Sequence, residues 1–142
     1  MLVRLLYASR AAQPLSSEVV DTILSQSRKH NTDHGVTGIL CYSGDIFMQV
    51  LEGGRKEVSS LYNTIVRDGR HRNVELLHFE EITERRFSGW TMGQVNLAKV
   101  NPSTLLKYSA RPVLDPFLVS GAASMALLDE LIATAAIVGR PL

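Results

Sequence analysis

One polar residue, Gln49, stands in the middle of the apolar run formed by residues 46–51. Such a run favours a buried strand. A carboxamide carries two N–H donors and an acceptor oxygen, and a buried polar group without partners costs about 1–3 kcal/mol. Something polar must therefore meet Gln49 inside the protein. A structural partner from the core satisfies this requirement, and so does a bound ligand.

Two further polar residues, Tyr7 and Asn31, fall on faces that should be apolar. Tyr7 lies in the strand-like residues 2–9 on the same face as Leu5, and Asn31 continues the apolar stripe of a predicted helix at its last turn. With Gln49 they offer a phenol and two carboxamides, which suit a planar heterocycle with an imide edge. Taken singly, Tyr7 also fits a core residue, and Asn31 fits a helix C-terminus, where asparagine is common.

A second group of candidates follows later in the chain. Asp68, Arg70 and His71 come after the second predicted helix and suit an anionic or hydroxylated tail of the same ligand, although they also fit a solvated turn. Trp90 and Met92 lie two residues apart on a predicted strand, so we expect them to face the same side. From spacing alone, core packing explains both.

The remaining reactive residue types indicate no further chemistry. Cys41 has no nearby base and reads as a small core residue. His30, His34 and His78 form no metal-binding pattern, and the chain has no glycine-rich phosphate loop or nucleophile elbow. We therefore expect no metal site.

Apolar periodicity predicts the elements that must position these residues. The order is strand, helix, strand, strand, helix, strand, strand, which favours a ferredoxin-like α+β fold (βαββαββ) with a five-stranded mixed sheet and two helices on one face. The predicted strands cover residues 2–9, 36–42, 46–52, 74–83 and 90–97, and the helices cover about 16–31 and 58–68.

The C-terminal part of the chain is expected to cover the second face of the sheet. The two hairpin strands are apolar on both faces, so the face without helices also needs a cover. Residues 101–109 and 120–137 are predicted as two helices. A stripe of apolar residues on the second helix would lie on the sheet, pair two copies of the chain or bind a partner. Its members are Met125, Leu128, Ile132 and Ala135.

Composition excludes several classes of protein. The chain has 142 residues, which fits one domain, and 15 Lys+Arg against 14 Asp+Glu leave no basic surplus for nucleic acid. One cysteine and the absence of a signal-peptide pattern favour the cytoplasm. Asp129 and Glu130 at the centre of the longest apolar stretch argue against a membrane span.

Five ordered segments resemble the BLUF domain, a class of bacterial blue-light sensors that use flavin. The resemblance spans residues 2–97, and we take residues 1–97 as the flavin-binding domain and residues 98–142 as a helical extension. The segments are LYAS at 6–9, HN at 30–31 with VTGIL at 36–40, FMQVLEG at 47–53, DGRH at 68–71 and FSGWTM at 87–92.

This resemblance implies a role for each candidate residue. FAD would lie between the two helices, with FMN or riboflavin as substitutes. Tyr7 would donate an electron and a proton, Gln49 would change its hydrogen bonds by rotation or tautomerisation, and Asn31 would hold the imide edge. The residues that would help to position the cofactor are His30, Asp68, Arg70 and His71. The strand that carries Trp90 and Met92 would report the light state.

The resemblance also implies a route for the signal. A sensor with two tail helices has no catalytic module, so we expect no enzyme activity and a separate effector, such as a cyclic-dinucleotide phosphodiesterase or a transcriptional regulator. Two alternatives are a light-independent ferredoxin-like binding module and an acylphosphatase-like hydrolase. The hydrolase would need a phosphate loop after the first strand, and residues 9–12 contain no glycine.

Overall fold

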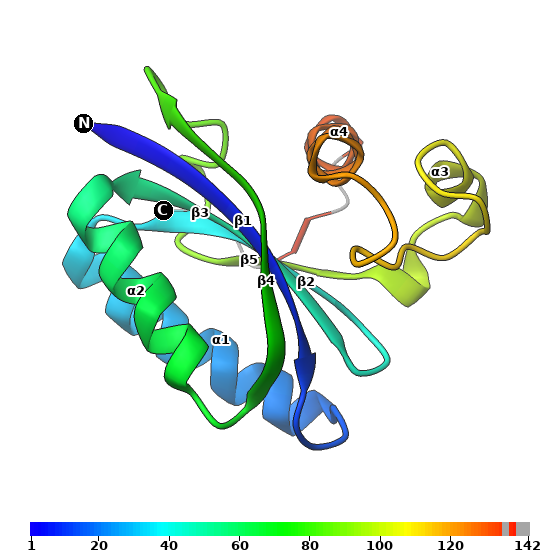
Figure 1. Cartoon of the computed structure of the whole chain (residues 1–142), viewed down its shortest axis with the longest axis horizontal. Helices are drawn as coiled ribbons and strands as arrows, with labels where there is room; N and C mark the ends of the chain where they lie inside the picture. The colour runs from blue at the N-terminus through cyan, green and yellow to red at the C-terminus, as the bar shows by residue number, and fades with distance from the viewer. Residues whose placement is uncertain (135–136, 139–142) are drawn as a thin grey trace.

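The computed structural model describes residues 1–134 and 137–138 (Figure 1). The predicted order of strands and helices is confirmed. The elements are β1 (Leu2–Ala11), α1 (Ser17–His34), β2 (Thr37–Ser43), β3 (Ile46–Gly54), α2 (Arg55–Arg67), β4 (His71–Ile82), β5 (Gly93–Asn96), the 3₁₀ helix η1 (Leu97–Lys99), α3 (Pro102–Leu106) and α4 (Gly121–Ala133).

The five strands form one mixed sheet in the order β4-β1-β3-β2-β5. β1 is antiparallel to both β3 and β4, and β2 is antiparallel to β3, whereas β5 is parallel to β2. This is the ferredoxin-like arrangement with one additional strand at the edge. β1 and β3 therefore lie side by side at the centre, and residues on them are the most enclosed in the sheet.

Local signals define the ends of α1. The Ser16 side chain accepts a hydrogen bond from the Val19 N–H at 3.2 Å, which caps the first turn. The helix ends at Gly35, which has a φ of 66° and donates its N–H to the Asn31 carbonyl. The helix is longer than predicted because Gly35 is its left-handed end. Asn31 consequently lies inside the last turn of the helix.

Helices cover both faces of the sheet, as predicted (Figure 1). α1 and α2 pack on one face, where Leu5 and Tyr7 belong to a core that includes Leu24 and Val58. α4 lies across the opposite face. Its buried residues pack against the alternate residues of the central strands, namely Met125, Leu127, Leu128 and Leu131 against Leu6, Met48 and Val50.

The C-terminal elements are shorter than predicted. α3 has five residues rather than nine, and a turn follows it in which the Ser109 hydroxyl lies 2.9 Å from the carbonyl oxygens of Leu105, Arg111 and Val113, with one proton to donate. α4 ends at Ala133, with Thr134 as its cap. Of the predicted stripe, Met125 and Leu128 are buried against the sheet and Ile132 is partly buried, while Ala135 lies outside the described residues.

No helix in residues 1–134 is long and apolar enough to cross a bilayer. The cytoplasmic location stays a prediction.

The packing of α4 can be tested by truncating one of its side chains. Leu127→Ala should lower the free energy of unfolding by about 2–5 kcal/mol, because Leu127 is completely buried and its loss leaves a cavity. Urea unfolding measures this change. Leu118→Ala is the control, since Leu118 is 83% exposed and its loss should change stability by less than about 0.5 kcal/mol. Equal stability of both variants would show that α4 does not pack on the sheet.

Candidate functional site

Tyr7 and Gln49 form a buried pair at the centre of the sheet. They lie directly opposite each other in the β1–β3 ladder, and both point toward α1 and α2. The Tyr7 hydroxyl donates a hydrogen bond to Gln49 Oε1 at 2.5 Å. The two residues are only 1% and 5% exposed. The Tyr7 hydroxyl is therefore the polar partner that buried Gln49 requires for its side-chain oxygen.

The donor side of Gln49 faces a weaker partner. Gln49 Nε2 donates to the sulfur of Met92 at 3.3 Å. A thioether is a weak acceptor, so little free energy holds this side of the carboxamide in place. Gln49 is thus held firmly at its oxygen and loosely at its nitrogen, which allows its amide group to change partners.

Asn31 reaches the same region from α1 and is almost completely buried. Its Nδ2 donates to the Thr91 carbonyl at 2.9 Å. Its Oδ1 is buried and has no hydrogen-bond partner among the described residues. A buried acceptor without a donor costs about 1–3 kcal/mol, so this atom suits a ligand N–H.

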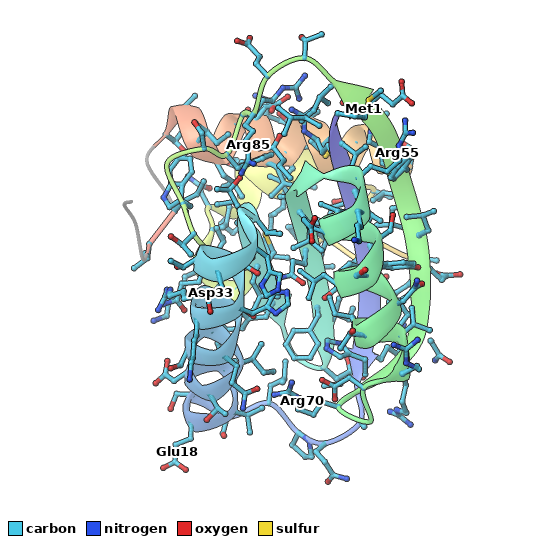
Figure 2. The ribbon with its side chains drawn as sticks, turned by 90° about the vertical axis from the view of Figure 1, so that its left-hand side faces the viewer. Met1, Glu18, Asp33, Arg55, Arg70 and Arg85 are labelled. Atoms are coloured by element: carbon cyan, nitrogen blue, oxygen red, sulfur yellow. The ribbon has the colours of Figure 1, made fainter. Side chains whose placement is uncertain are left out.

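A cavity of about 210 Å³ joins the three residues. Side chains from α1, α2 and the central strands surround it, and Figure 2 looks onto the side where these two helices flank the strands. Apolar side chains line much of it, namely Ile23, Leu40, Leu61 and Ile65. An apolar cavity with a few converging polar groups is typical of a small-molecule or cofactor site.

Arg70 also lines this cavity and lies in the lower part of the view in Figure 2. Its guanidinium binds the Asp68 carboxylate at 2.7 Å and the Gln26 side-chain oxygen at 2.9 Å. The Arg70 hydrogen bond lowers the pKa of Asp68, so this carboxyl is ionised. Arg70 thereby joins α1 to the turn between α2 and β4, next to the cavity.

Two histidines complete the lining. His71 Nδ1 lies 2.7 Å from the Ser9 hydroxyl, and its ring meets the Tyr7 ring edge-on. Burial lowers the pKa of His71. The His30 ring stacks on His34 with 4.1 Å between ring centroids, and burial, followed by the His34 charge, lowers the pKa of His30. Neutral imidazoles offer both a donor and an acceptor.

Burial raises the pKa of Tyr7 far above its ordinary value of 10.0, and the nearby Asp68 carboxylate raises it further. The hydroxyl therefore keeps its proton at neutral pH. That proton points at Gln49, which fixes the direction in which it can leave.

The structure contradicts the prediction that Trp90 and Met92 face the same side. Met92 is buried in the core shared with Tyr7, whereas Trp90 packs against the core on the α4 side. Strand alternation does not apply, because β5 begins only at Gly93 and both residues precede it. The Gly38 N–H holds the Trp90 carbonyl there, and side chains of α1 hold the next two carbonyls, which the strand pattern could not reveal.

Sequence reasoning also missed residues that act through their backbone or from α1. The carbonyl of Thr91 holds Asn31, and Arg28 Nε donates to the Met92 carbonyl at 3.2 Å. Gln26 binds Arg70. The helical spacing of Gln26 and His30, four residues apart, places both on the cavity side of α1 and could have indicated Gln26.

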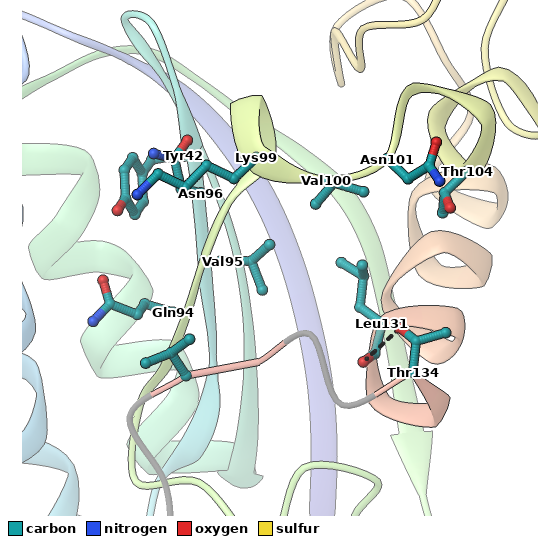
Figure 3. A pocket seen from close by; sticks show the side chains of 11 residues that line it. Tyr42, Gln94, Val95, Asn96, Lys99, Val100, Asn101, Thr104, Leu131 and Thr134 are labelled. Atoms are coloured by element: carbon teal, nitrogen blue, oxygen red, sulfur yellow. Dashed lines mark hydrogen bonds between the residues drawn. The ribbon is translucent and has the colours of Figure 1, made fainter.

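A larger cavity of about 670 Å³ lies between β5 and helices α3 and α4 (Figure 3). Its lining includes Tyr42, Asn96, Lys99 and Asn101, and none of the predicted site residues reaches it. No buried polar side-chain atom without a partner, among the described residues, belongs to this lining. The smaller cavity is therefore the better candidate for a functional site.

Comparison with known proteins agrees with this geometry. The sequence profile of the BLUF family, sensors of blue-light using FAD, matches residues 2–93. The chain belongs to the BLUF family. The matched residues include every candidate site residue and end at the start of β5.

Related BLUF proteins resemble this chain over different shares of their length. The photoactivated adenylate cyclase subunit beta of Euglena gracilis is 34% identical over 92 residues, which are 64% of this chain and 11% of the cyclase subunit. The chain thus spans about a tenth of that relative. Among solved structures, the BLUF protein BlrB in its dark state is 35% identical, with a TM-score of 0.74 and coverage of 94% and 96% of the two chains. BlsA in its photo-activated state is 30% identical, with a TM-score of 0.81 and coverage of 93% and 95%.

The partly buried histidine at the cavity, His71, makes stability depend on pH. The folded protein resists protonation of His71, so the free energy of unfolding should fall as the pH drops below 6.5, the ordinary pKa of histidine. Above that pH, His71 is neutral in both the folded and the unfolded protein and does not lower the free energy of unfolding. His71→Gln should weaken this dependence, measured by urea unfolding at about pH 5.5 and about pH 7.5. His78→Gln, on the other face of β4, controls for the loss of a histidine. An unchanged dependence in His71→Gln would contradict the assignment.

Proposed function

We propose that this chain is a blue-light sensor that binds a flavin between α1 and α2, beside Tyr7, Asn31 and Gln49. One observation carries the proposal. The buried Tyr7–Gln49 hydrogen bond and the partnerless oxygen of Asn31 line the same cavity. A flavin ring has an imide N–H between two carbonyls, which suits Asn31 Oδ1 as an acceptor and the amide of Gln49 as a donor.

We propose that FAD is the form bound, as the description of the family states for its members. Arg70 and Asp68 in the lining of the cavity suit the phosphate and hydroxyl groups of the cofactor tail. His30 and His71 line the cavity and would help to position the cofactor. FMN and riboflavin share the ring and are the substitutes that the same cavity would accept.

The flavin, once bound, supplies absorption of blue light and a strong electron acceptor in its excited state. The protein's part begins at Tyr7, whose proton is held on the hydroxyl and directed at Gln49 Oε1. Loss of an electron makes a phenol strongly acidic, and Gln49 Oε1 is placed to receive the proton. A carboxamide protonated at its oxygen could release a proton from its nitrogen to the flavin, which would hold the electron taken from Tyr7, or it could rotate before that electron and the proton return to Tyr7. Both changes exchange a donor for an acceptor on the side now facing Met92.

The dark state should return without an energy source. If the Gln49 amide rotates, only hydrogen bonds differ between the two arrangements, and each contributes about 0.5–1.5 kcal/mol net. The stored free energy is therefore a few kcal/mol at most. The lit state is a metastable population that decays once illumination stops.

We propose that the output passes to a separate effector protein and that the chain itself has no catalytic activity. Residues 1–97 would be the sensor, and residues 98–142 the helical extension that carries the signal. The Euglena relative, named as a photoactivated adenylate cyclase, supports a nucleotide-signalling effector. A cyclic-dinucleotide phosphodiesterase or a transcriptional regulator stays a candidate. Self-association through Met125 and Leu128 is disfavoured, because both are buried against the sheet.

The hydrolase alternative has no support in the geometry. A phosphate loop would have to follow the first strand, but β1 continues through Ala11. The light-independent binding module differs from the sensor only in its photochemistry. A purified protein that is yellow and shifts its flavin absorption reversibly under blue light separates the two.

Replacing Gln49 tests its role directly. Gln49→Leu should retain flavin but lose the light-induced shift in absorption, because leucine offers no group that can exchange hydrogen bonds. Absorption spectra in the dark and under blue light measure both properties. Gln94→Leu, on β5 and outside the site, is the control and should shift normally. A normal light-induced absorption shift in Gln49→Leu would contradict the role assigned to Gln49.

Removing the Tyr7 hydroxyl tests the donor. Tyr7→Phe should give a yellow protein whose absorption does not shift, since the ring remains but the hydrogen bond to Gln49 is lost. Tyr62→Phe is the control, because the Tyr62 ring lies 5.8 Å from the Tyr7 ring. It should keep the shift. A photocycle of wild-type amplitude in Tyr7→Phe would assign the donor role to another residue.

A further inference from the structure

A buried carboxylate, Glu52, lies outside the flavin site but on the same strand as Gln49. It follows Gln49 by three residues and therefore points to the opposite face of the sheet. Glu52 is 0% exposed. Its two oxygens accept three hydrogen bonds from three different residues. The donors are Arg4 Nε at 2.7 Å and the Arg86 N–H at 3.1 Å on Oε2, and the Phe87 N–H at 2.7 Å on Oε1.

The charge of Glu52 is balanced inside the protein. Arg4, opposite Glu52 in the β1–β3 ladder, is 3% exposed and also binds Glu80 on β4. One buried cation thus lies between one buried carboxylate and one that is partly exposed. Burying two ions costs desolvation free energy that even a well hydrogen-bonded pair often only just repays, so the Arg4–Glu52 pair is weak evidence for a purely stabilising role.

Glu52 holds the beginning of the segment that leads to Met92. Residues 86–92, here called the return segment, form the last part of the connection from β4, which ends at Ile82, to β5, which begins at Gly93. Glu52 fixes its first two N–H groups, while donors from α1 and β2 fix its last three carbonyls. These bonds are Gly38 N to Trp90 O at 3.0 Å, Asn31 Nδ2 to Thr91 O at 2.9 Å and Arg28 Nε to Met92 O at 3.2 Å.

The return segment also contacts α4 at the end that Glu52 holds. The Arg86 guanidinium binds the Asp129 carboxylate at 3.0 Å. Phe87 is completely buried in the core that contains Leu127 and Leu128. The two residues whose backbone N–H groups meet Glu52 therefore carry side chains that reach α4.

We propose that Glu52 is a positioning residue that holds the return segment in its resting conformation and thereby couples the flavin site to α4. This inference rests on the proposed function. When Gln49 changes its hydrogen bond to Met92, the displacement enters the segment at one end. Because Glu52 fixes the other end to β3, the displacement must be absorbed between them, where Phe87 and Trp90 pack on the α4 side.

A purely structural role for Glu52 makes a different prediction, and the chain offers a matched control. Glu52→Gln and Glu80→Gln each remove one carboxylate charge from Arg4 with almost no change in shape. Only Glu52 also accepts the backbone N–H groups of the return segment. Effects shared by both variants report the loss of charge near Arg4, and effects found only in Glu52→Gln report the anchor.

Hydrogen exchange of the flavin-loaded full chain, in the dark and under blue light, tests the proposal. In Glu52→Gln we expect the amides of Arg86 and Phe87 to exchange at least about tenfold faster in the dark, and the light-induced change in α4 exchange to be lost. Glu80→Gln and the wild type should keep both. The flavin absorption shift should persist in all three proteins.

A single tryptophan gives a second readout. Incorporation of 5-fluorotryptophan places one ¹⁹F resonance at Trp90, on the return segment. In the wild type this resonance should shift with light, and in Glu52→Gln it should broaden or split in the dark. If Glu52→Gln does not fold, the variant that also carries Arg4→Met replaces it, because it removes the buried cation that would otherwise be left with Glu80 as its carboxylate partner.

Two outcomes overturn the inference. A light-induced change in α4 of wild-type size in Glu52→Gln would show that the anchor is not needed. An identical loss in Glu80→Gln would assign the effect to charge alone. Failure of the proposed function looks different, because the wild type would then show no absorption shift at all.

Discussion

The hydrogen bond between Tyr7 and Gln49 is the interaction on which the rest of this structure depends. It requires two polar side chains to meet where the sheet is most enclosed, so the strands that carry them must be neighbours in a fixed register. The β1–β3 ladder provides this, with Tyr7 opposite Gln49. A slip of one residue between the two strands would turn one of these side chains to the α4 face and remove the pair. The apolar residues around the pair therefore specify the register as well as stability.

The two faces of the sheet carry different functional groups. On the α1 and α2 face, Gln49 and Tyr7 meet the cavity, and on the opposite face Glu52 holds the return segment against the α4 side. Strand alternation places these functions on adjacent parts of one strand without contact between them. The return segment is the physical link, because it passes from one face to the other between Phe87 and Met92.

Most of the fold could be predicted from sequence because its elements have clear periodicity and end signals. The β2–β3 hairpin, the Ser16 cap and the second covered face are read from neighbouring residues. Convergence of Tyr7, Asn31 and Gln49 could be predicted because strand alternation turns Tyr7 and Gln49 toward the helices, and the helical period turns Asn31 toward the sheet. The orientation of Trp90 could not, since no ladder governs the residues before β5, and side chains from distant α1 hold them instead. The partners of Glu52 were equally hidden, because two of its three donors are backbone groups that every residue possesses.

The short edge strand β5 is the part of the sheet that opens most easily. β5 has four residues, pairs with β2 alone among the named strands, and lies at the edge, whereas β1 is bonded on both sides along its length. Short edge pairings exchange with solvent through local fluctuations, while central strands exchange only when the whole domain unfolds. The central strands thus open only with the whole domain, whereas the edge strand β5 can detach and re-form on its own. A sensor of this kind can rearrange its edge strand repeatedly while its central strands stay folded.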